Sequence, residues 1–280
     1  MSQPIVTIIC LCYNHERFVQ EALESVWKQS YPSIQLIIVD DASSDGSVGV
    51  IKKLIVNKPD VIFLEQRENQ GSCRSFNRAL KLAQGELFID LAADDVLLPE
   101  RVTTGVDMFQ DLGHTYGLQF SDAEIIDENG KHLRYHSGKF PHACIPQGDI
   151  YKDLIDRYFI CSPTMMFTRK VMEHNQGYDE SLAFEDFDLW MRASRDFKFC
   201  YSPQVLVKRR VVKTSMSKNQ FTKNNSQRWS TLKVCEKIKH LNRTQEEDKA
   251  LRHRLTYEFL LSLKMIDIKL AFGFLKLWWR

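Results

Sequence analysis

The stretch Gly85-Glu86-Leu87-Phe88-Ile89-Asp90-Leu91-Ala92-Ala93-Asp94-Asp95 joins a short apolar run to two adjacent carboxylates. Leu87 to Ile89 predict a buried strand, and Pro99-Glu100 shortly afterwards is a favourable helix start. Open α/β sheets bind ligands at the carboxyl ends of their strands, where Asp94 and Asp95 fall. Because neighbouring carboxylates repel each other, a divalent cation shared with a substrate's phosphates would suit them. The alternative is that both acids only cap the next helix.

Strands and helices alternate four times in roughly the first 95 residues. Four apolar runs predict buried strands, and stretches with apolar residues at helical spacing separate them. The runs are Ile5–Cys12, Ile34–Val39, Val61–Leu64 and Leu87–Ile89. This order predicts a parallel sheet with right-handed crossovers. Tyr13, Asp41 and Asp95 each follow a strand, so we expect their side chains to lie at one edge of the sheet.

The chain of 280 residues suffices for one large domain or two small ones, and a hydrophobic fraction of 44% supports a sizeable core. Its 7 cysteines show no metal-ligand spacing, which favours reduced, buried thiols in a cytosolic protein. The N-terminus lacks a signal-peptide pattern, and no run of about 18 apolar residues predicts a spanning helix. Glycine-rich dinucleotide and P-loop motifs are absent, so acids and a metal would have to hold a nucleotide instead.

The formal net charge of +2 hides an asymmetry along the chain. Residues 205–280 hold 18 Lys and Arg against 6 Asp and Glu, whereas the remainder is acidic. A basic C-terminal segment on an acidic body indicates an anionic partner surface, either a membrane or a nucleic acid.

Several motifs occur in an order and spacing that resembles the family 2 glycosyltransferases, which have the GT-A fold. They are Val6–Ile9 with Tyr13-Asn14, Val39–Gly46, Asn69–Gly71, Gly85–Asp95 and Glu185–Arg192. The resemblance runs from about Pro4 to Ser217. It implies an α/β, Rossmann-like mixed sheet flanked by helices in residues 1–217, with a nucleotide-binding half at 1–95 and an acceptor-binding half at 96–217. Residues 218–280 would form a basic helical C-terminal extension.

The resemblance also implies roles for residues at the strand ends. Tyr13 would stack on or flank the nucleobase, although an aromatic residue there can also simply pack on the sheet. Asp41 would accept a hydrogen bond from the base, and Asp40 would help to hold its loop. Asp95 would ligate Mg²⁺ or Mn²⁺, and Asp94 would contact the ribose or, through water, the metal.

The catalytic role implied by the resemblance falls on Asp186, at the start of a predicted helix that contains Leu189, Trp190 and Ala193. Asp186 would be the general base that takes the proton from an acceptor hydroxyl as its oxygen attacks the sugar's anomeric carbon. The alternative is that Glu185 and Asp186 are first-turn acids favoured by the helix dipole. Trp190 either lines the sugar site or packs in the core.

The chain departs from the family pattern at three places. Ala93 stands where many relatives carry a further acid, which leaves fewer ligands for a metal. Ser75-Phe76-Asn77 stands where relatives often have Ala-Arg-Asn, so a cation is missing from that helix position. Val212 occupies the place of a histidine in a mobile lid, and Arg210 or Lys213 would then be the cation that faces the donor's diphosphate.

The middle of the chain is expected to build the acceptor pocket from loops. Tyr116–Ile126 predicts a strand, and Asp127–Gly130 predicts a hairpin turn. His132, His136 and His142 lack metal-site spacing and are expected to be exposed loop residues. Further strands are predicted at Cys161–Phe167 and Val205–Val207.

The C-terminal segment predicts helices over Phe221–His240 and Gln245–Arg280. Its end, Phe272–Arg280, pairs tryptophans with Lys and Arg, which is typical of a membrane interface. One interpretation is peripheral docking on the anionic inner leaflet of the cell membrane. The alternative is that the last helix packs on the domain or on a second copy of the chain, as in a homodimer.

Residues and resemblance together predict an inverting glycosyltransferase that moves a sugar from a nucleotide diphosphate donor, first of all a UDP-sugar, to a hydroxyl of a saccharide. The expected setting is bacterial surface-polysaccharide assembly, such as O-antigen, with an acceptor on a polyprenyl diphosphate lipid and no nucleic acid partner. We expect a cytoplasmic protein on the inner face of the membrane. Two other classes stay open: a nucleotidyltransferase-like enzyme that releases diphosphate, and a non-catalytic membrane- or partner-binding module with a decayed site.

Overall fold

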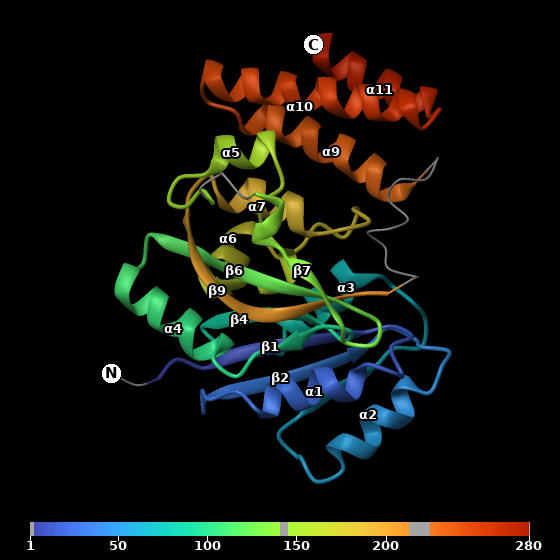
Figure 1. The fold of residues 1–280 in the computed structure, drawn as a ribbon, viewed down its shortest axis with the longest axis vertical. Coiled ribbons are helices and arrows are strands. Elements are labelled where there is room, and N and C mark those ends of the chain that lie inside the picture. Colours follow the sequence, from blue (N-terminus) through green and yellow to red (C-terminus); the bar gives the residue numbers. More distant parts are fainter. Residues whose placement is uncertain (1–2, 141–144, 213–224, 280) are drawn as a thin grey trace.

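The computed structural model describes residues 3–140, 145–212 and 225–279. Within these ranges nine strands form one mixed sheet in the order β3-β2-β1-β4-β8-β6-β9-β5, with β7 paired to β6. The C-terminal helices lie at the end of the molecule farthest from α2 (Figure 1). Five predicted features lie outside the described residues: His142, Lys213, the helix start at Phe221, the helix end at Arg280 and the domain boundary between residues 217 and 218.

The N-terminal half confirms the predicted alternation of strands and helices. Its elements are β1 (Val6–Cys12), α1 (Val19–Trp27), β2 (Ile34–Asp40), α2 (Ser47–Ile55), β3 (Ile62–Glu65), α3 (Ser72–Leu80) and β4 (Leu87–Ala92). β1 pairs in parallel with β2 and β4, and β2 pairs in parallel with β3. Side chains alternate between the faces of a strand, so Ile9 joins the core under α3 while Ile8 and Cys10 join the core under α1 and α2. Burial on both faces explains why the strand runs are continuously apolar.

The second half completes the sheet and makes it mixed. Its elements are β5 (Val96–Leu97), α4 (Arg101–Leu112), β6 (Tyr116–Asp127), β7 (His132–Tyr135), α5 (Tyr151–Asp156), β8 (Met166–Thr168), α6 (Arg169–Asn175), α7 (Asp186–Ala193) and β9 (Lys198–Val211), with short 3₁₀ turns at Ser137–Lys139 and Ser162–Thr164. β8 is antiparallel to both β4 and β6, whereas β9 is parallel to β6. The predicted hairpin at 127–130 joins β6 to β7, with Gly130 at a φ of 82°.

Several local predictions need correction. The strand predicted from Cys161 begins only at Met166, because a 3₁₀ turn that contains Pro163 precedes it. The strand predicted at 205–207 extends over the 14 residues of β9, which pairs along the length of β6. His132 belongs to β7 and not to a loop. His136 is buried, and its Nε2 lies 2.9 Å from the carbonyl oxygen of Phe159.

Three C-terminal helices pack on the second half of the chain. They are α9 (Ser226–Leu241), α10 (Gln245–Lys264) and α11 (Ile268–Trp279). Ile266, at a φ of 57°, separates α10 from α11, where one continuous helix was predicted. Their buried residues, including Cys235, Leu255 and Phe274, share one core with Phe187 of α7. No described helix combines the length and the low charge needed to cross a bilayer.

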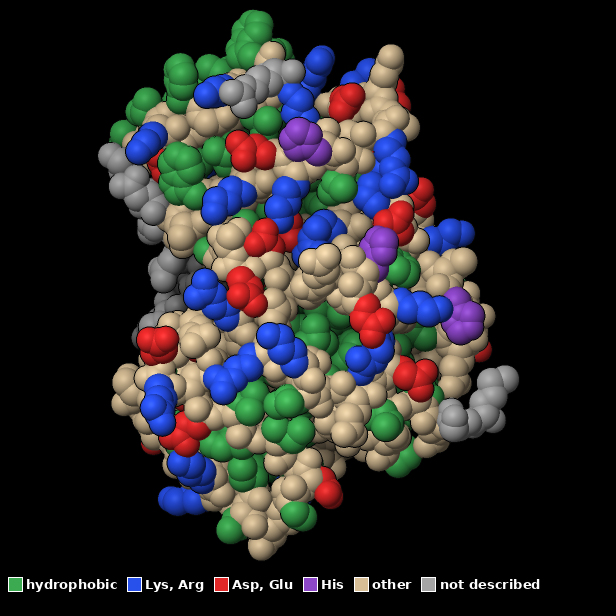
Figure 2. All heavy atoms as spheres, turned by 180° about the vertical axis from the view of Figure 1, so that it is seen from behind, with side chains coloured by type: hydrophobic (Ala, Val, Ile, Leu, Met, Phe, Trp, Pro, Cys, Tyr) green, Lys and Arg blue, Asp and Glu red, His purple; other side chains and the backbone are tan. Residues whose placement is uncertain are grey.

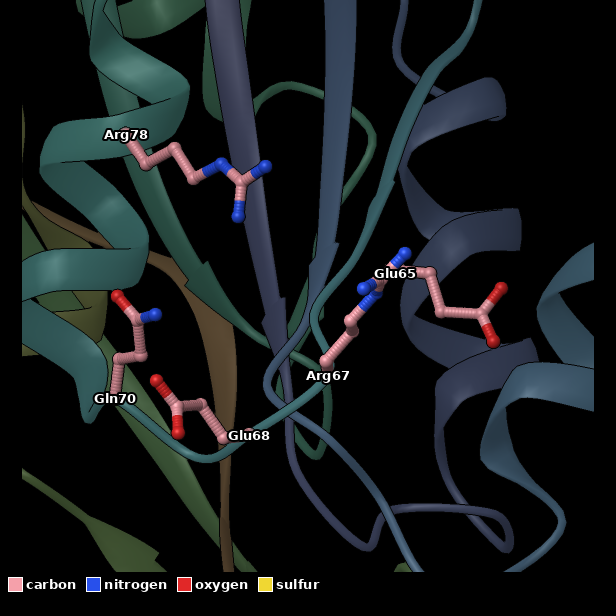
Figure 3. A pocket seen from close by; sticks show the side chains of 5 residues that line it. All are labelled: Glu65, Arg67, Glu68, Gln70 and Arg78. Carbon is pink, nitrogen blue, oxygen red and sulfur yellow. The ribbon is translucent and has the colours of Figure 1, made fainter.

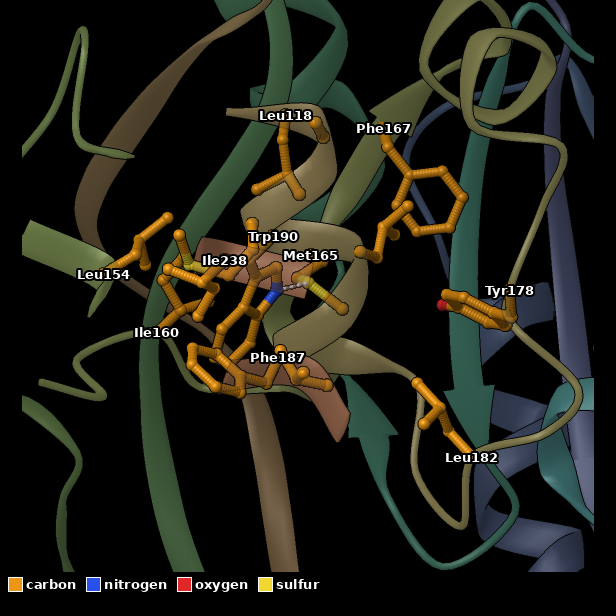
Figure 4. Packing of buried hydrophobic residues seen from close by; sticks show 14 of the residues in the cluster. Leu118, Leu154, Ile160, Met165, Phe167, Tyr178, Leu182, Phe187, Trp190 and Ile238 are labelled. Carbon is orange, nitrogen blue, oxygen red and sulfur yellow. Dashed lines mark hydrogen bonds between the residues drawn. The ribbon is translucent and has the colours of Figure 1, made fainter. Parts of the chain in front are cut away.

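The packing around Trp190, a residue of α7, decides between its two predicted roles. Its side chain is 3% exposed, and its indole N–H donates to the sulfur of Met165 at 2.7 Å. Figure 4 shows Trp190 among Leu154, Ile160 and Ile238. Of the two readings of Trp190, core packing is therefore the one that the structure supports.

Candidate active site

Parallel pairing brings the ends of β1, β2 and β4 to one edge of the sheet. Leu11 of β1 is in register with Ala92 of β4, and the amide of Asp41 donates to the carbonyl of Cys12 at 2.9 Å. Tyr13, Asp41 and the Asp94–Asp95 turn therefore leave the sheet at neighbouring positions. This edge is the ligand-binding edge of open α/β sheets.

Tyr13 and Asp41 differ in how much of each remains available to a ligand. Tyr13 is 47% exposed, so its ring is open for stacking. Asp41 is 6% exposed and accepts from the amides of Gln70 and Gly71, each at 2.8 Å, and from the side chain of Gln66 at 3.1 Å. An ionised carboxylate has about four acceptor positions, so Asp41 retains about one for a ligand while it holds the loop at 66–71.

A cavity of about 430 Å³ adjoins this loop. It is lined by Glu65, Arg67, Glu68, Gln70 and Arg78. In Figure 3, Arg78 projects from α3 towards the opening, and the other four side chains come from the end of β3 and the loop that follows it. Since the amide of Gln70 is bound to Asp41, the cavity opens beside the carboxylate expected to contact the base.

Asp94 and Asp95 form the acidic turn after β4. Asp95 is 3% exposed, and its Oδ1 accepts from the amide of Arg210 at 2.8 Å. Burial and the neighbouring Asp94 raise the pKa of Asp95 well above its usual range.

His15, which was not predicted from the sequence as a site residue, lies close to this turn, with its Nε2 4.0 Å from Asp94 Oδ2. Its Nδ1 is buried without a hydrogen-bond partner in the described part of the chain.

These residues fit a divalent cation only in part. In the ranges that the structure describes, no group of three or more His, Cys, Asp or Glu side chains converges to hold a metal ion. However, Mg²⁺ is usually held by one or two carboxylates together with substrate phosphates and water. Burial and Asp94 raise the pKa of Asp95 although Arg209 and Arg210 act to lower it, so further positive charge arriving with a diphosphate would stabilise the ionised turn.

The position of Arg210 differs from the expectation that it contacts the nucleotide sugar. The residue is 5% exposed, and its guanidinium donates to Glu21 Oε2 at 2.5 Å, to the Asp94 carbonyl at 2.9 Å and to the Asp127 carbonyl at 3.3 Å. It also lies over the ring of Phe18. Each of its three guanidinium nitrogens donates to a protein group, so Arg210 holds the Asp94–Asp95 turn in place.

Arg209 is a further cation of the site that was not predicted from the sequence. Its charge acts on two acids, Asp95 and Asp186. Its backbone belongs to the β6–β9 ladder, whereas its side chain is partly exposed and makes no hydrogen bond or ion pair within the described ranges. Its charge lowers the pKa of Asp95 and also that of Asp186, so it lies within electrostatic reach of both. Its neighbour Lys208 is instead directed to Glu124, at 3.9 Å.

Asp186 is the first residue of α7 and is partly exposed. Its Oδ1 accepts from the amide of Phe187 at 2.7 Å. Burial raises the pKa of Asp186, while the Phe187 amide, the Ser162 hydroxyl and Arg209 act in the opposite direction. A carboxylate whose proton affinity is raised by burial is a better base than one in water.

Two further acids lie beside Asp186. Glu185 accepts a hydrogen bond from the Ser72 hydroxyl at 3.0 Å, which ties α7 to the start of α3. Burial and the nearby Asp90 and Asp186 raise the pKa of Glu185 to about 8. Burial raises the pKa of Asp90 to about 7. Asp90 is not among the site residues predicted above, although an acid inside an otherwise apolar strand is a signal for one.

The family model described as Glycosyl transferase family 2 matches residues 7–175. An uncharacterized glycosyltransferase of Methanocaldococcus jannaschii is 29% identical over 215 residues, which cover 75% of this chain and 72% of that protein. The putative teichuronic acid biosynthesis glycosyltransferase TuaG of Bacillus subtilis is 25% identical over 245 residues, which cover 86% of this chain and 92% of TuaG.

Solved structures show the same fold. TarS 1-349 of S. aureus, in complex with UDP-GlcNAc, has a TM-score of 0.71 at 19% identity and covers 91% of this chain and 73% of its own. The mannosyltransferase PcManGT of Pyrobaculum calidifontis, with GDP-Man and Mn²⁺, has a TM-score of 0.71 at 17% identity and covers 97% of this chain and 74% of its own. This likeness confirms the predicted GT-A fold. The family match extends over more than half of the chain, which therefore belongs to glycosyl transferase family 2 and is a glycosyltransferase.

Proposed function

We propose that this glycosyltransferase inverts the anomeric configuration as it transfers a sugar from a UDP-sugar to a hydroxyl of a saccharide acceptor. The proposal is supported above all by the end of β9, where the amide of Arg210 binds Asp95 at 2.8 Å and the charge of the adjacent Arg209 acts on both Asp95 and Asp186. One cation within reach of both acids fits a single cleft with the donor's diphosphate at one end and the base at the other.

The reaction would proceed as a single displacement. The carboxylate of Asp186 takes the proton of the acceptor hydroxyl, and that oxygen forms a bond to the anomeric carbon. The bond between the anomeric carbon and the diphosphate oxygen breaks, and the nucleoside diphosphate leaves with the electron pair. Arg209 faces the negative charge that grows on the leaving group. Attack from the side opposite the leaving group inverts the anomeric centre.

The nucleotide end of the cleft is assigned to Tyr13, Asp41 and the cavity beside them. The exposed ring of Tyr13 would stack on the base, and the remaining acceptor position of Asp41 would take a base N–H. Arg67 and Arg78 would face the phosphates, while Glu65 and Glu68 of the same lining can accept from donors of the nucleotide. The structural relatives were solved with UDP-GlcNAc and GDP-Man, which supports a nucleotide-sugar donor for this chain.

A divalent cation, Mg²⁺ or Mn²⁺, would be held by Asp95, with Asp94 beside it, together with the phosphates of the donor. The ion would supply positive charge next to the diphosphate. The amide of Arg210 positions Asp95 by binding its Oδ1. Mn²⁺ in the PcManGT structure supports this assignment.

The acceptor is proposed to be a growing surface polysaccharide on a polyprenyl diphosphate lipid, at the inner face of the cell membrane. The support is the biosynthetic role in the printed name of TuaG, together with the basic, tryptophan-containing C-terminus. A lipid-linked acceptor would bring the reaction to the membrane surface.

A donor screen that follows nucleoside diphosphate release tests the proposal. Asp186→Asn should lower kcat by about 10²–10⁴-fold, the usual contribution of a general base, while the affinity for UDP with Mn²⁺ stays nearly unchanged. Asp60→Asn, an exposed acid before β3, is the matched control and should keep full activity. Retained turnover in Asp186→Asn would remove Asp186 from the mechanism. Diphosphate release would indicate a nucleotidyltransferase, and no UDP binding at millimolar ligand would indicate a decayed site.

A further inference from the structure

Exposed apolar side chains gather on the last two helices. Seven large hydrophobic residues in the described ranges are more than half exposed, and six of them lie between 257 and 279. These six, here called the C-terminal face, are Tyr257, Leu260, Ile266, Ile268, Phe272 and Trp279. Figure 2 shows hydrophobic side chains concentrated at the end of the molecule that these helices form. The seventh residue, Val56, lies at the end of α2.

The core does not require these residues. α11 already buries Leu270, Phe274 and Leu277, which follow helical spacing along one side. Ile268, Phe272 and Trp279 repeat the same spacing along the other side, where nothing in the described chain covers them. α11 thus has two apolar sides, with Lys269 and Lys276 exposed between them, and an apolar helix side is normally covered by protein or by lipid.

Ile266 is a second observation that favours an outward-facing apolar surface. Its backbone is left-handed, with a φ of 57°, and its side chain is 68% exposed. Gly or Asn suits that conformation, whereas a β-branched residue is disfavoured in it. Neither the local backbone nor the core therefore favours isoleucine at this position, but an apolar docking surface does.

The exposed charges within residues 257–279 all have one sign. Between residues 257 and 279 the exposed charged side chains are Lys264, Lys269 and Lys276. The two acids of the same segment, Glu258 and Asp267, are 6% and 3% exposed. Glu258 is held by the guanidinium groups of Arg228 and Arg254. Within residues 257–279, a partner is thus offered apolar contact together with exposed positive charge.

We propose that the C-terminal face docks on an anionic lipid bilayer, with its apolar side chains in the interfacial region and the three lysines at the headgroups. Tryptophan and tyrosine favour this region, and each nearby lysine adds attraction to anionic lipids. A second copy of the chain is the weaker candidate, because two copies would bring lysines against lysines with no exposed acid between residues 257 and 279 to offset them.

The C-terminal helices α9 and α10 also contact the residues that surround the catalytic helix α7. The guanidinium of Arg254 in α10 lies 4.0 Å from the ring centroid of Tyr158 and 5.0 Å from that of Phe187, the residue after Asp186. Lys237 of α9 bridges Asp179 and Asp188, at 2.6 Å to each. Docking through α10 and α11 would therefore place the catalytic helix at a set distance from the bilayer. This consequence rests on the proposed function, whereas the docking itself does not.

Vesicle co-sedimentation of the full chain tests the proposal, with phosphatidylcholine alone and with added phosphatidylglycerol. The chain should bind the anionic vesicles and bind the neutral ones more weakly. Phe272→Ser with Trp279→Ser should weaken binding by about tenfold or more, since each removes a large apolar contact. Val56→Ser is the matched control and should bind as the parent does. Lys264, Lys269 and Lys276 changed together to Gln should remove the preference for anionic lipid.

Ile266→Asn separates docking from folding. This variant should keep or raise the melting temperature, because Asn tolerates the left-handed backbone, and it should still weaken vesicle binding. Equal recovery of parent and Phe272→Ser/Trp279→Ser protein with anionic vesicles would overturn the proposal. So would a concentration-dependent dimer in light scattering that this double variant abolishes, which would assign the face to a second copy. Donor turnover on a soluble acceptor reports separately on the proposed function.

Discussion

The hydroxyl of Tyr178 donates to Oδ2 of Asp90 at 3.0 Å, across 88 positions of the sequence. Asp90 of β4 also lies within electrostatic reach of Asp186, the first residue of α7. Burial raises the pKa of Asp90 to about 7, nearby Asp186 acts in the same direction, and the hydroxyl of Tyr178 opposes them.

The stability of the chain should depend on pH through Asp90. The pKa of Asp90 is about 7 in the folded chain and close to 3.8 when unfolded, so the folded chain keeps a proton that the unfolded chain releases. Its contribution to stability is complete below about pH 4 and is lost as the pH rises through about 7. Asn stays neutral and still accepts from Tyr178.

Asp90→Asn should therefore raise the melting temperature relative to the parent by several degrees at about pH 8, and have little effect at about pH 4. Thermal unfolding at both pH values measures this difference. Asp60→Asn, exposed and remote from β4, should show no pH-dependent change. An Asp90→Asn effect of equal size at both pH values would show that its ionisation is not responsible.

Arg209→Gln should move the pH profile of the reaction. Arg209 lowers the pKa of Asp186, so its removal should raise that pKa. A base works only when it is deprotonated, so the acidic limb of kcat/KM should shift to higher pH. Loss of a charge-assisted contact to the diphosphate should also weaken donor binding by about 10-fold or more. Lys208→Gln is the neighbouring control, and an unmoved acidic limb in Arg209→Gln would contradict the assignment.

Arg210→Lys should destabilise the chain although it keeps the charge. Lysine cannot reproduce the fork that joins Glu21 to the carbonyls of Asp94 and Asp127. We expect a loss of about 2–3 kcal/mol in urea unfolding, together with weaker Mn²⁺-dependent UDP binding as the acidic turn loosens. Unchanged stability with lost donor binding would instead indicate that Arg210 contacts the donor directly.

Gly71→Ala should loosen the loop beside the nucleotide cavity. Gly71 has a φ of 86° and a ψ of 161°, a region open almost only to glycine, and its amide binds Asp41 Oδ2 at 2.8 Å. No atom lies within 4 Å of an added Cβ, so any cost comes from the backbone alone. We expect about 1–3 kcal/mol of destabilisation and a lower UDP affinity by calorimetry.

Gly49→Ala is the matched control for this substitution. Gly49 also has open space around an added Cβ, but it lies inside α2 with an ordinary backbone. Alanine there should stabilise the chain by about 0.5–1 kcal/mol. A Gly71→Ala variant that behaves like Gly49→Ala would show that the loop tolerates another conformation.

Local patterns were sufficient for the parallel half of the sheet. Continuous apolar runs such as Val6–Cys12 predict strands buried on both faces without any knowledge of distant contacts. The helices between them carry apolar residues at helical spacing. The same patterns place Tyr13, Asp41 and Asp95 at strand ends, because strand polarity follows directly from chain order.

The sequence by itself determined the fold family and the acids at its ligand-binding edge, because both follow from spacing along the chain. Only the tertiary structure decided which cation faces those acids. Arg209 and Arg210 are adjacent and chemically alike, but β9 pairs with both β5 and β6, and that pairing delivers Arg210 to Glu21 and leaves Arg209 unpaired within the described chain. Such a choice depends on contacts between residues up to 189 positions apart, which no local pattern specifies.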